Sequence, residues 1–303
     1  MIYPKPLMQN YTIGLIAPAG PLKNIEISEV AYALNNLGYN VKVTRTCHKP
    51  YKGYLSGTDE ERARELETMF LDNEVDVILC LRGGYGTTRI LNLIDFDIIK
   101  NNPKIFIGFS DITALHIAIN QICDLVTYHG IMAGSINKWD LFTYNSLISA
   151  LNFHKELLIE NPDNEEIVSL YDGRCSGKII GGNLSLIVST LGTAYEIDTK
   201  DKILFIEEVD EYTYKIDKML NQLEMANKIK ECSGIIFGEF TDCKPASRED
   251  DTVHDVIKEF VLKNKKPTLC NVKSGHSIPM VTIPLNAKCF MDTYSKEIRI
   301  VKN

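Results

Sequence analysis

The chain has 303 residues, of which 45% are hydrophobic and 24% are charged, and its formal net charge at pH 7 is −7. This composition is typical of a globular protein long enough for two domains, and the negative charge disfavours nucleic acid or an anionic membrane surface as a partner. No apolar run approaches the ~18 residues of a membrane-spanning helix. The segment 1–10 has no apolar signal core, so we expect a cytoplasmic protein.

The eight cysteines are scattered along the chain without a C-x-x-C pair, and several, such as Cys80, lie inside apolar runs. Free, buried thiols in a reducing compartment are therefore the expected state. No cluster of histidine, cysteine and carboxylate residues has the spacing of a zinc site. We expect neither a metal nor a cofactor.

The first half of the chain alternates short apolar runs with helical patterns. The run 75–81 is apolar apart from Asp76, which is typical of a strand buried on both faces of a parallel sheet. The whole pattern predicts a doubly wound α/β unit with strands near 13–17, 40–44, 75–81, 104–108 and 125–128, and helices near 24–37, 59–71 and 111–121.

The second half has shorter strands with fewer helices between them. A polar, acidic, proline-containing stretch precedes it, which indicates a linker. The expected organisation is a first domain over 1–155, a linker over 156–172, and a mixed α/β domain over 173–303. The clearest strands of this second domain are 202–207, 234–240, 287–292 and 297–301, with helices near 214–226 and 253–262.

Ser110 lies where the buried strand should turn sharply into the helix that begins near Asp111. A serine at such a turn exposes its Oγ beside backbone N–H groups, which favour the negative charge of an acyl-transfer intermediate. Gly108 removes side-chain bulk at the corner, although Ile112 stands where the second glycine of G-x-S-x-G would be. The alternative is a serine that only caps the following helix.

A serine nucleophile needs a base, and two of the six histidines lie where a base is expected. His129 follows a parallel strand at its carboxyl end, where sites collect. His276 lies in a loop directly after a glycine. His116 is expected to be structural, and His154 and His254 to lie on the surface.

The acid and the oxyanion donors also have candidates at strand ends. Glu207 and Glu208 end an apolar strand, and strand alternation does not choose between them. The loop Arg82-Gly83-Gly84-Tyr85-Gly86 lacks the spacing of a phosphate-binding loop, yet adjacent glycines allow backbone N–H groups to approach a ligand closely. A tight turn without function is the alternative.

Several segments, taken in order, resemble the serine LD-carboxypeptidase family. The matching segments lie between about residues 13 and 290 and are Leu15-Ile16-Ala17-Pro18-Ala19-Gly20, Arg82-Gly83-Gly84-Tyr85-Gly86, Gly108-Phe109-Ser110-Asp111, Gly181-Gly182-Asn183-Leu184, Leu204-Phe205-Ile206-Glu207-Glu208 and Gly275-His276. One departure is Ile131, where the family commonly has proline. The resemblance implies a flavodoxin-like domain plus a mixed α/β domain, with the site between them, in a homodimer.

The resemblance also implies site residues and a substrate. The triad maps onto Ser110, Glu207 and His276, and the oxyanion donors onto the backbone N–H groups of Gly84 and Asp111. The implied reaction removes a C-terminal D-amino acid from an L-configured centre, as in release of D-alanine from a muramoyl tetrapeptide during cell-wall recycling.

Two other functions stay open. Related peptidases inactivate peptide–nucleotide antibiotics, and a homologue without turnover would only bind a peptide. The cation that would hold the substrate's terminal carboxylate is also open, because Arg82, Arg89 and Lys178 all lie in or near the matching segments.

Overall fold

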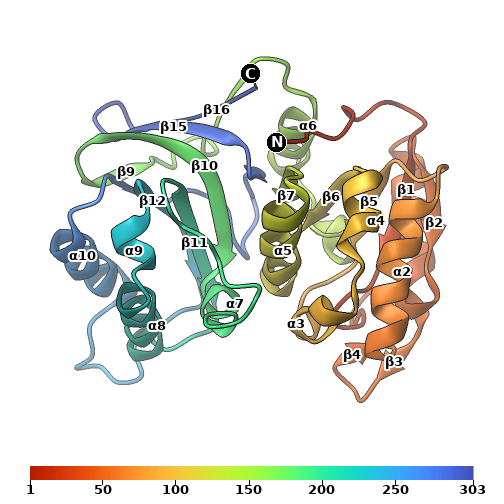
Figure 1. Ribbon diagram of the computed structural model, residues 1–303, viewed down its shortest axis with the longest axis horizontal. Coiled ribbons are helices and arrows are strands. Elements are labelled where there is room, and N and C mark those ends of the chain that lie inside the picture. The colour runs from red at the N-terminus through yellow and green to blue at the C-terminus, as the bar shows by residue number, and fades with distance from the viewer. Residues whose placement is uncertain (303) are drawn as a thin grey trace.

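The computed structural model describes residues 1–302, which form two halves side by side, each built on its own β-sheet (Figure 1). The first sheet has the order β14-β7-β6-β5-β1-β2. Its five parallel strands are β1 (Thr12–Ile16), β2 (Asn40–Val43), β5 (Val77–Cys80), β6 (Ile105–Gly108) and β7 (Thr127–His129). Counted along the chain, this order is 2-1-3-4-5, the flavodoxin-like arrangement. The expected fold of the first half is therefore confirmed.

Helices cover both faces of the first sheet, which is why β5 and β6 are buried throughout. On one face, side chains of α1 (Ile27–Asn36) and α6 (Leu141–Asn152) join one hydrophobic core. On the other face, side chains of α2 (Asp59–Leu71), α4 (Phe96–Asn101) and α5 (Thr113–Cys123) join a second. Short elements complete this half: α3 (Thr87–Ile90), the hairpin of β3 (Pro50–Tyr51) and β4 (Leu55–Ser56), and 3-10 turns at η1 (Arg45–His48), η2 (Leu91–Leu93), η3 (Ser110–Ile112) and η4 (Ala133–Lys138).

The second sheet is mixed, as expected, with the order β8-β16-β15-β10-β11-β12-β13-β9. The central strands β10 to β13 run parallel, and the outer strands pair antiparallel. The strands are β8 (Glu156–Leu158), β9 (Val168–Tyr171), β10 (Arg174–Asn183), β11 (Ile203–Val209), β12 (Gly234–Thr241), β13 (Thr268–Cys270), β15 (Lys288–Asp292) and β16 (Glu297–Val301). The helices are α7 (Leu184–Ser189), α8 (Thr213–Met225), α9 (Lys228–Glu231) and α10 (Val253–Asn264).

The segment 156–172, expected as a linker, contributes two edge strands to the second sheet. β8 pairs with β16 at one edge, and β9 pairs with β13 at the other. Both are short and none of their residues is fully buried, so their sequences lack the apolar pattern of an inner strand. The exact domain boundaries stay a prediction.

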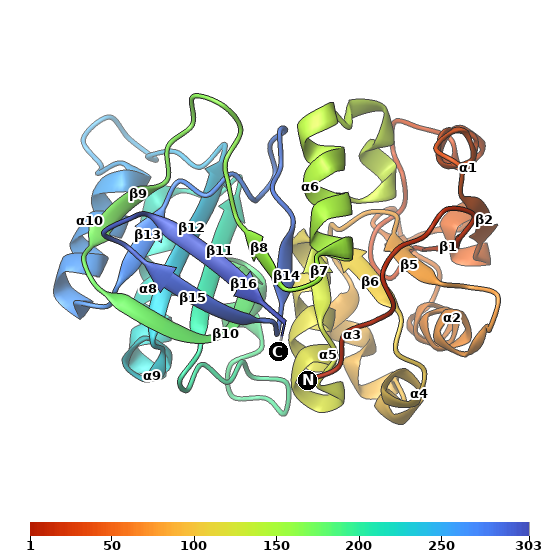
Figure 2. The same cartoon turned by 90° about the horizontal axis from the view of Figure 1, so that it is seen from above.

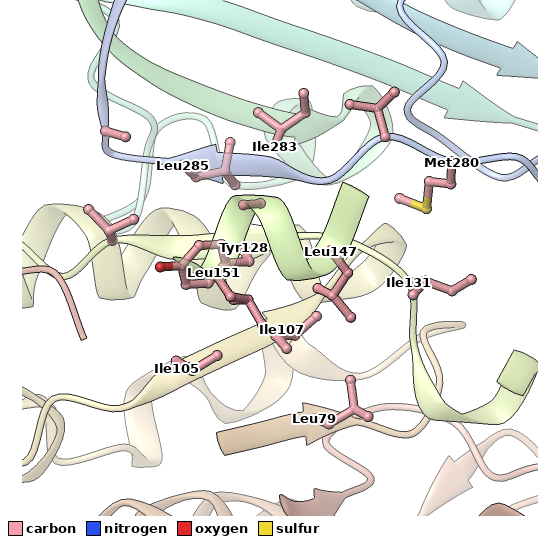
Figure 3. Packing of buried hydrophobic residues seen from close by; sticks show 14 of the residues in the cluster. Leu79, Ile105, Ile107, Tyr128, Ile131, Leu147, Leu151, Met280, Ile283 and Leu285 are labelled. Carbon is pink, nitrogen blue, oxygen red and sulfur yellow. The ribbon is translucent and has the colours of Figure 1, made fainter. Parts of the chain in front are cut away.

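Strand β14 (Ile283–Leu285) comes from the second half of the chain but pairs antiparallel with β7 at the edge of the first sheet. Seen from above, it lies between the two halves (Figure 2). Ile283 and Leu285 share one packed cluster with Tyr128 of β7 and with Leu147 and Leu151 of α6 (Figure 3). The two halves are therefore joined by packing and also by one strand of the second half, β14, which pairs within the first sheet.

No helix among residues 1–302 combines the length and the apolar character needed to cross a membrane.

Candidate active site

The serine elbow, residues 108–112, joins β6 to α5. Ser110 has a φ of 63°, in the left-handed region that side chains other than glycine rarely occupy. The turn also crowds Gly108, where an added methyl group would lie 2.9 Å from a carbon of Ile112. Such a strained position is stable only when its surroundings hold it, and it lifts the serine away from the strand. The helix predicted from Asp111 begins instead with the 3-10 turn η3, and α5 follows from Thr113.

The glycine loop, residues 82–86, lies directly against this elbow. A methyl group added to Gly83 would lie 2.8 Å from Ser110 Cβ, 3.0 Å from Ser110 Oγ and 3.3 Å from the backbone nitrogen of Asp111. Gly84 follows at a φ of +107° and is exposed. Only a residue without a side chain allows the loop backbone to come this close to the serine hydroxyl.

Buried polar contacts tie the glycine loop to the elbow. The Asp111 carboxylate accepts a hydrogen bond from the backbone N–H of Thr87 at 2.8 Å, and the Thr87 hydroxyl donates to the Asp111 carbonyl at 2.5 Å. Burial raises the pKa of the Asp111 carboxyl. Beneath the loop, the buried Arg62 guanidinium donates to the carbonyl of Gly86 at 2.9 Å and also to that of Pro18. Loop and elbow are therefore held as one unit.

The second half reaches the elbow through the end of β10. A methyl group on Gly182 would lie 2.5 Å from the hydroxyl oxygen of Thr113, so the two backbones pack without an intervening side chain. The backbone N–H of Asn183 donates to that same hydroxyl at 3.0 Å. Asn183 is the register partner of Glu207 on β11. This contact brings the end of β11 beside the first turn of α5.

Glu207 and His276 form a hydrogen-bonded pair: the imidazole Nδ1 lies 2.8 Å from Glu207 Oε2. Glu207 is fully buried, and desolvation raises the pKa of its carboxyl, with the His276 contact acting in the opposite direction. The pairing of β11 with β12 is irregular between Ile206 and Glu208. Such a bulge redirects a side chain at a strand end, and here Glu207 contacts the histidine.

The neighbouring Glu208 contacts a different set of groups. Its Oε1 accepts from the Asn183 amide at 2.8 Å and from the backbone N–H of Val209 at 2.9 Å. Its Oε2 accepts from the backbone N–H and the hydroxyl of Ser185 at 2.8 and 2.6 Å. Glu208 therefore joins the start of α7 to the end of β11, and its hydrogen bonds go to groups other than the histidine.

His276 lies on the histidine loop, residues 271–282, which is fixed on both sides. On the β12 side, Glu239 donates its backbone N–H to the Ser274 carbonyl at 3.1 Å. On the other side, the backbone N–H groups of Met280 and Thr282 donate to hydroxyls of α6, at 2.9 Å each. The loop therefore spans the two halves, and its second end continues into β14.

The second ring nitrogen of His276, Nε2, is buried and has no hydrogen-bond partner among residues 1–302. The ring packs against Phe109, with centroids 4.8 Å apart. Phe109 immediately precedes Ser110. The imidazole therefore has one nitrogen hydrogen-bonded to a carboxylate and the other unpaired, and its ring packs against the elbow through Phe109.

Four of the other histidines have different surroundings. His116 is fully buried, with Nδ1 2.8 Å from the Thr127 hydroxyl and Nε2 2.8 Å from the Gly108 carbonyl. His129 is also fully buried, and neither of its nitrogens has a partner among the described residues. Its ring packs between Phe109 and Phe205, with centroid separations of 5.8 and 5.0 Å. Burial lowers the pKa of both histidines, to about 4 for His116. The exposed residues His154 and His254 lie on the surface, as predicted.

Two residues of this site have no role assigned from the sequence. Phe109 forms the aromatic contact between the elbow and His276, and Asn183 connects Glu208 to Thr113. The signal for Asn183 was its place after two glycines at the end of a buried strand. For Phe109, the only signal in the sequence was its position directly before the serine.

Within residues 1–302, no group of three or more histidine, cysteine, aspartate or glutamate side chains is arranged to hold a metal ion. What the residues offer instead is a strained serine, an imidazole paired with a carboxylate, and backbone that approaches the serine without side chains. This combination has the parts needed for acyl transfer through a serine.

Residues 13–130 match the LD-carboxypeptidase N-terminal domain and residues 176–291 match the LD-carboxypeptidase C-terminal domain. The fold and the two matched domains thus define a two-part α/β peptidase, and the chain belongs to the LD-carboxypeptidase family.

The chain is 40% identical to the probable murein peptide carboxypeptidase of Bacillus subtilis, over 97% of this chain and 92% of that protein. It is 30% identical to the microcin C7 self-immunity protein of Escherichia coli, over 82% of this chain and 80% of that one. The crystal structure of muramoyltetrapeptide carboxypeptidase from Oxalobacter formigenes has the same fold. It aligns with a TM-score of 0.82 and 24% identity, over 96% of this chain and 99% of that one.

Proposed function

We propose that this protein is a serine LD-carboxypeptidase that releases a C-terminal D-amino acid from a murein peptide, with Ser110, His276 and Glu207 as its catalytic triad. The observation that carries the proposal is the hydrogen bond of 2.8 Å between His276 and the fully buried Glu207, with the imidazole packed on Phe109, which directly precedes a serine at φ 63°. The family membership and the 40% identity to a murein peptide carboxypeptidase support the substrate class.

In the proposed reaction, His276 Nε2 takes the proton of Ser110 as its oxygen attacks the amide carbonyl. Glu207 accepts a hydrogen bond from Nδ1, which fixes the tautomer and stabilises the imidazolium that forms. The tetrahedral intermediate collapses as His276 passes its proton to the amide nitrogen, and the D-amino acid leaves. A water molecule then attacks the serine ester with His276 as base, which releases the shortened peptide and restores the serine.

The oxyanion that develops on the carbonyl needs N–H donors near Ser110 Oγ. The proposed donors are the backbone N–H groups of Gly84 and Asp111. A methyl group on Gly83 would lie 3.0 Å from Ser110 Oγ and 3.3 Å from the Asp111 nitrogen, which supports this proposal because the loop that carries Gly84 packs directly against the hydroxyl and the start of η3.

The experiment is D-alanine release from purified muramoyl tetrapeptide, with the product masses read directly. Wild-type protein should release D-alanine, and Ser110→Ala should abolish release while keeping the fold. Activity should survive a chelator. Loss of activity with EDTA, or a fully active Ser110→Ala protein, would refute the serine mechanism.

A second candidate is an immunity-type peptidase that inactivates a peptide–nucleotide antibiotic, which the 30% identity to the microcin C7 self-immunity protein supports. A direct comparison of tetrapeptide and antibiotic conjugate as substrates distinguishes the two. The murein peptide is favoured because identity is higher and the alignment covers more of both chains. We further propose that the enzyme acts in the cytoplasm as a homodimer, which rests on the sequence alone.

A further inference from the structure

A carboxypeptidase must bind the free carboxylate at the end of its substrate. In that substrate, only the amide nitrogen and one carbon separate the scissile carbonyl from the terminal carboxylate. The cation that binds the carboxylate must therefore lie beside the oxyanion donors and not at a distant surface. It must also have hydrogen-bond donors that are not already used by a carboxylate of the protein.

Three cations of the chain fail one of these requirements. Arg89 is held by Asp59 in a two-pronged ion pair, with distances of 2.9 and 2.6 Å. Lys178 pairs at 2.6 Å with Asp124, which directly follows the C-terminal end of α5. Ser110 lies before the N-terminal end of the same helix. The helix alone separates the two by roughly 15 Å. Lys273 lies between Glu165 and Glu239, 3.4 Å from each.

Arg62 is near the glycine loop but is not available to a ligand. Its side chain has no exposed surface, and its guanidinium is bonded to the carbonyls of Pro18 and Gly86 and to the Asp59 carboxylate. It supports the loop from beneath.

Arg82 meets both requirements. It directly precedes Gly83 in the glycine loop and is partly exposed. Among residues 1–302 its guanidinium donates one hydrogen bond, from Nη1 to the Pro21 carbonyl at 3.1 Å, and it forms no ion pair. Four of its five N–H donors are therefore free.

The guanidinium lies over two glycines of the site. Methyl groups added to Gly20 and Gly84 would lie 2.8 and 3.4 Å from its Nη1. The guanidinium therefore packs against the backbone of Gly84, the proposed oxyanion donor. The absence of a side chain at Gly20 leaves the space that Arg82 occupies.

We propose that Arg82 binds the terminal carboxylate of the departing D-amino acid and so makes the enzyme a carboxypeptidase. This inference rests on the proposed function. The free donors would engage the carboxylate while the backbone N–H of Gly84 engages the scissile carbonyl. The same loop thereby sets the distance between the cleaved bond and the end of the peptide.

The test is a cycle of two enzymes and two substrates: wild type and Arg82→Ala, each assayed on the muramoyl tetrapeptide and on its C-terminal D-alaninamide. Arg82→Ala should lower kcat/KM for the acid on the order of 100-fold, because it removes one partner of a charge pair. For the amide it should change kcat/KM by less than about threefold, because no carboxylate is present to lose. Arg82→Lys should recover part of the activity on the acid.

Two controls separate this loss from misfolding. Arg89→Ala removes the same charge from α3, directly after the glycine loop, and should leave the preference for acid over amide unchanged. A fluorophosphonate should still label Ser110 in Arg82→Ala. Equal losses on acid and amide would overturn the role of Arg82. A wild-type protein that cleaves neither substrate would refute the proposed function, and this inference with it.

Discussion

The serine elbow and the histidine–glutamate pair are built in different ways. The elbow is local: one strand, one strained residue and one helix, contiguous in the chain. The histidine–glutamate pair joins residues 69 positions apart. It depends on the bulge in β11, on the histidine loop fixed on both sides, and on β14, which pairs within the first sheet. The proposed nucleophile is therefore a property of its own segment, whereas the proposed base is a property of the assembled halves.

The same contrast holds for two adjacent carboxylates. Glu207 and Glu208 are both buried, but Glu207 contacts His276 and Glu208 accepts hydrogen bonds from Asn183, Val209 and Ser185. Glu207 is placed to orient the proposed base, and Glu208 to hold the strand end. Identical substitutions at these positions should therefore have different consequences.

The largest expected effect is at Glu207. Glu207→Gln should lower kcat on the order of 10⁴-fold, because the amide can donate to Nδ1 and stabilise the wrong tautomer of His276. Glu208→Gln, the matched control, should keep kcat within about tenfold and instead lower the free energy of unfolding by about 1–3 kcal/mol, because a buried acceptor is lost. Steady-state kinetics and denaturant unfolding of both variants measure this. Equal kinetic losses would contradict the distinction.

The next largest effect is expected at Gly83, where the glycine loop contacts the serine elbow. Gly83→Ala places a methyl group 2.8 Å from Ser110 Cβ, so the loop and the elbow must separate. We expect kcat to fall by about 10²–10³, the usual effect of losing one oxyanion donor. Gly83 is not among the glycines with positive φ, so alanine causes no backbone strain there. Overpacking this contact should also lower the free energy of unfolding by about 1–3 kcal/mol, and a fully active Gly83→Ala enzyme would contradict the packing argument.

The smallest effect concerns stability. His116 has a pKa of about 4 in the folded protein against 6.5 for an unperturbed histidine, because burial opposes its charged form. Between these values the unfolded state binds more protons, so stability falls as pH falls. His116 should contribute a loss of about 2 kcal/mol between pH 7 and pH 5.

The measurement is denaturant unfolding of wild type and His116→Gln across that range. The variant should be less stable at pH 7, because it loses the hydrogen bonds of the imidazole to the Thr127 hydroxyl and the Gly108 carbonyl. Its free energy of unfolding should also fall less steeply as the pH is lowered. His154→Gln, at an exposed histidine, should keep the wild-type slope. A wild-type slope in His116→Gln would show that other groups cause the acid sensitivity.

Most of the fold could be predicted from the sequence because its signals are local. The apolar run at β5 and the helical pattern over 59–71 indicated a buried parallel strand and a helix, and both are present. Strand β14 could not be predicted, because its three residues pair with β7 across more than half the chain. The strands within 156–172 were hidden for a related reason: edge strands need little apolar surface.

In the candidate site, too, the features with local signals could be predicted and those set by tertiary contacts could not. Ser110 and the glycine loop could be singled out from turn chemistry, whereas the choice between Glu207 and Glu208 depended on a bulge that alternation does not encode. The choice among Arg82, Arg89 and Lys178 depended on which cations the folded chain pairs with carboxylates. Both are consequences of tertiary contacts.

In the proposed mechanism, His276, positioned by distant parts of the chain, activates one strained serine. The most direct test is intact-mass measurement of fluorophosphonate labelling, with peptide mapping, in wild type, Ser110→Ala and His276→Ala. We expect a single adduct on Ser110, none in Ser110→Ala, and labelling slowed by at least about 100-fold in His276→Ala. An adduct on another residue, or an unchanged rate in His276→Ala, would contradict it.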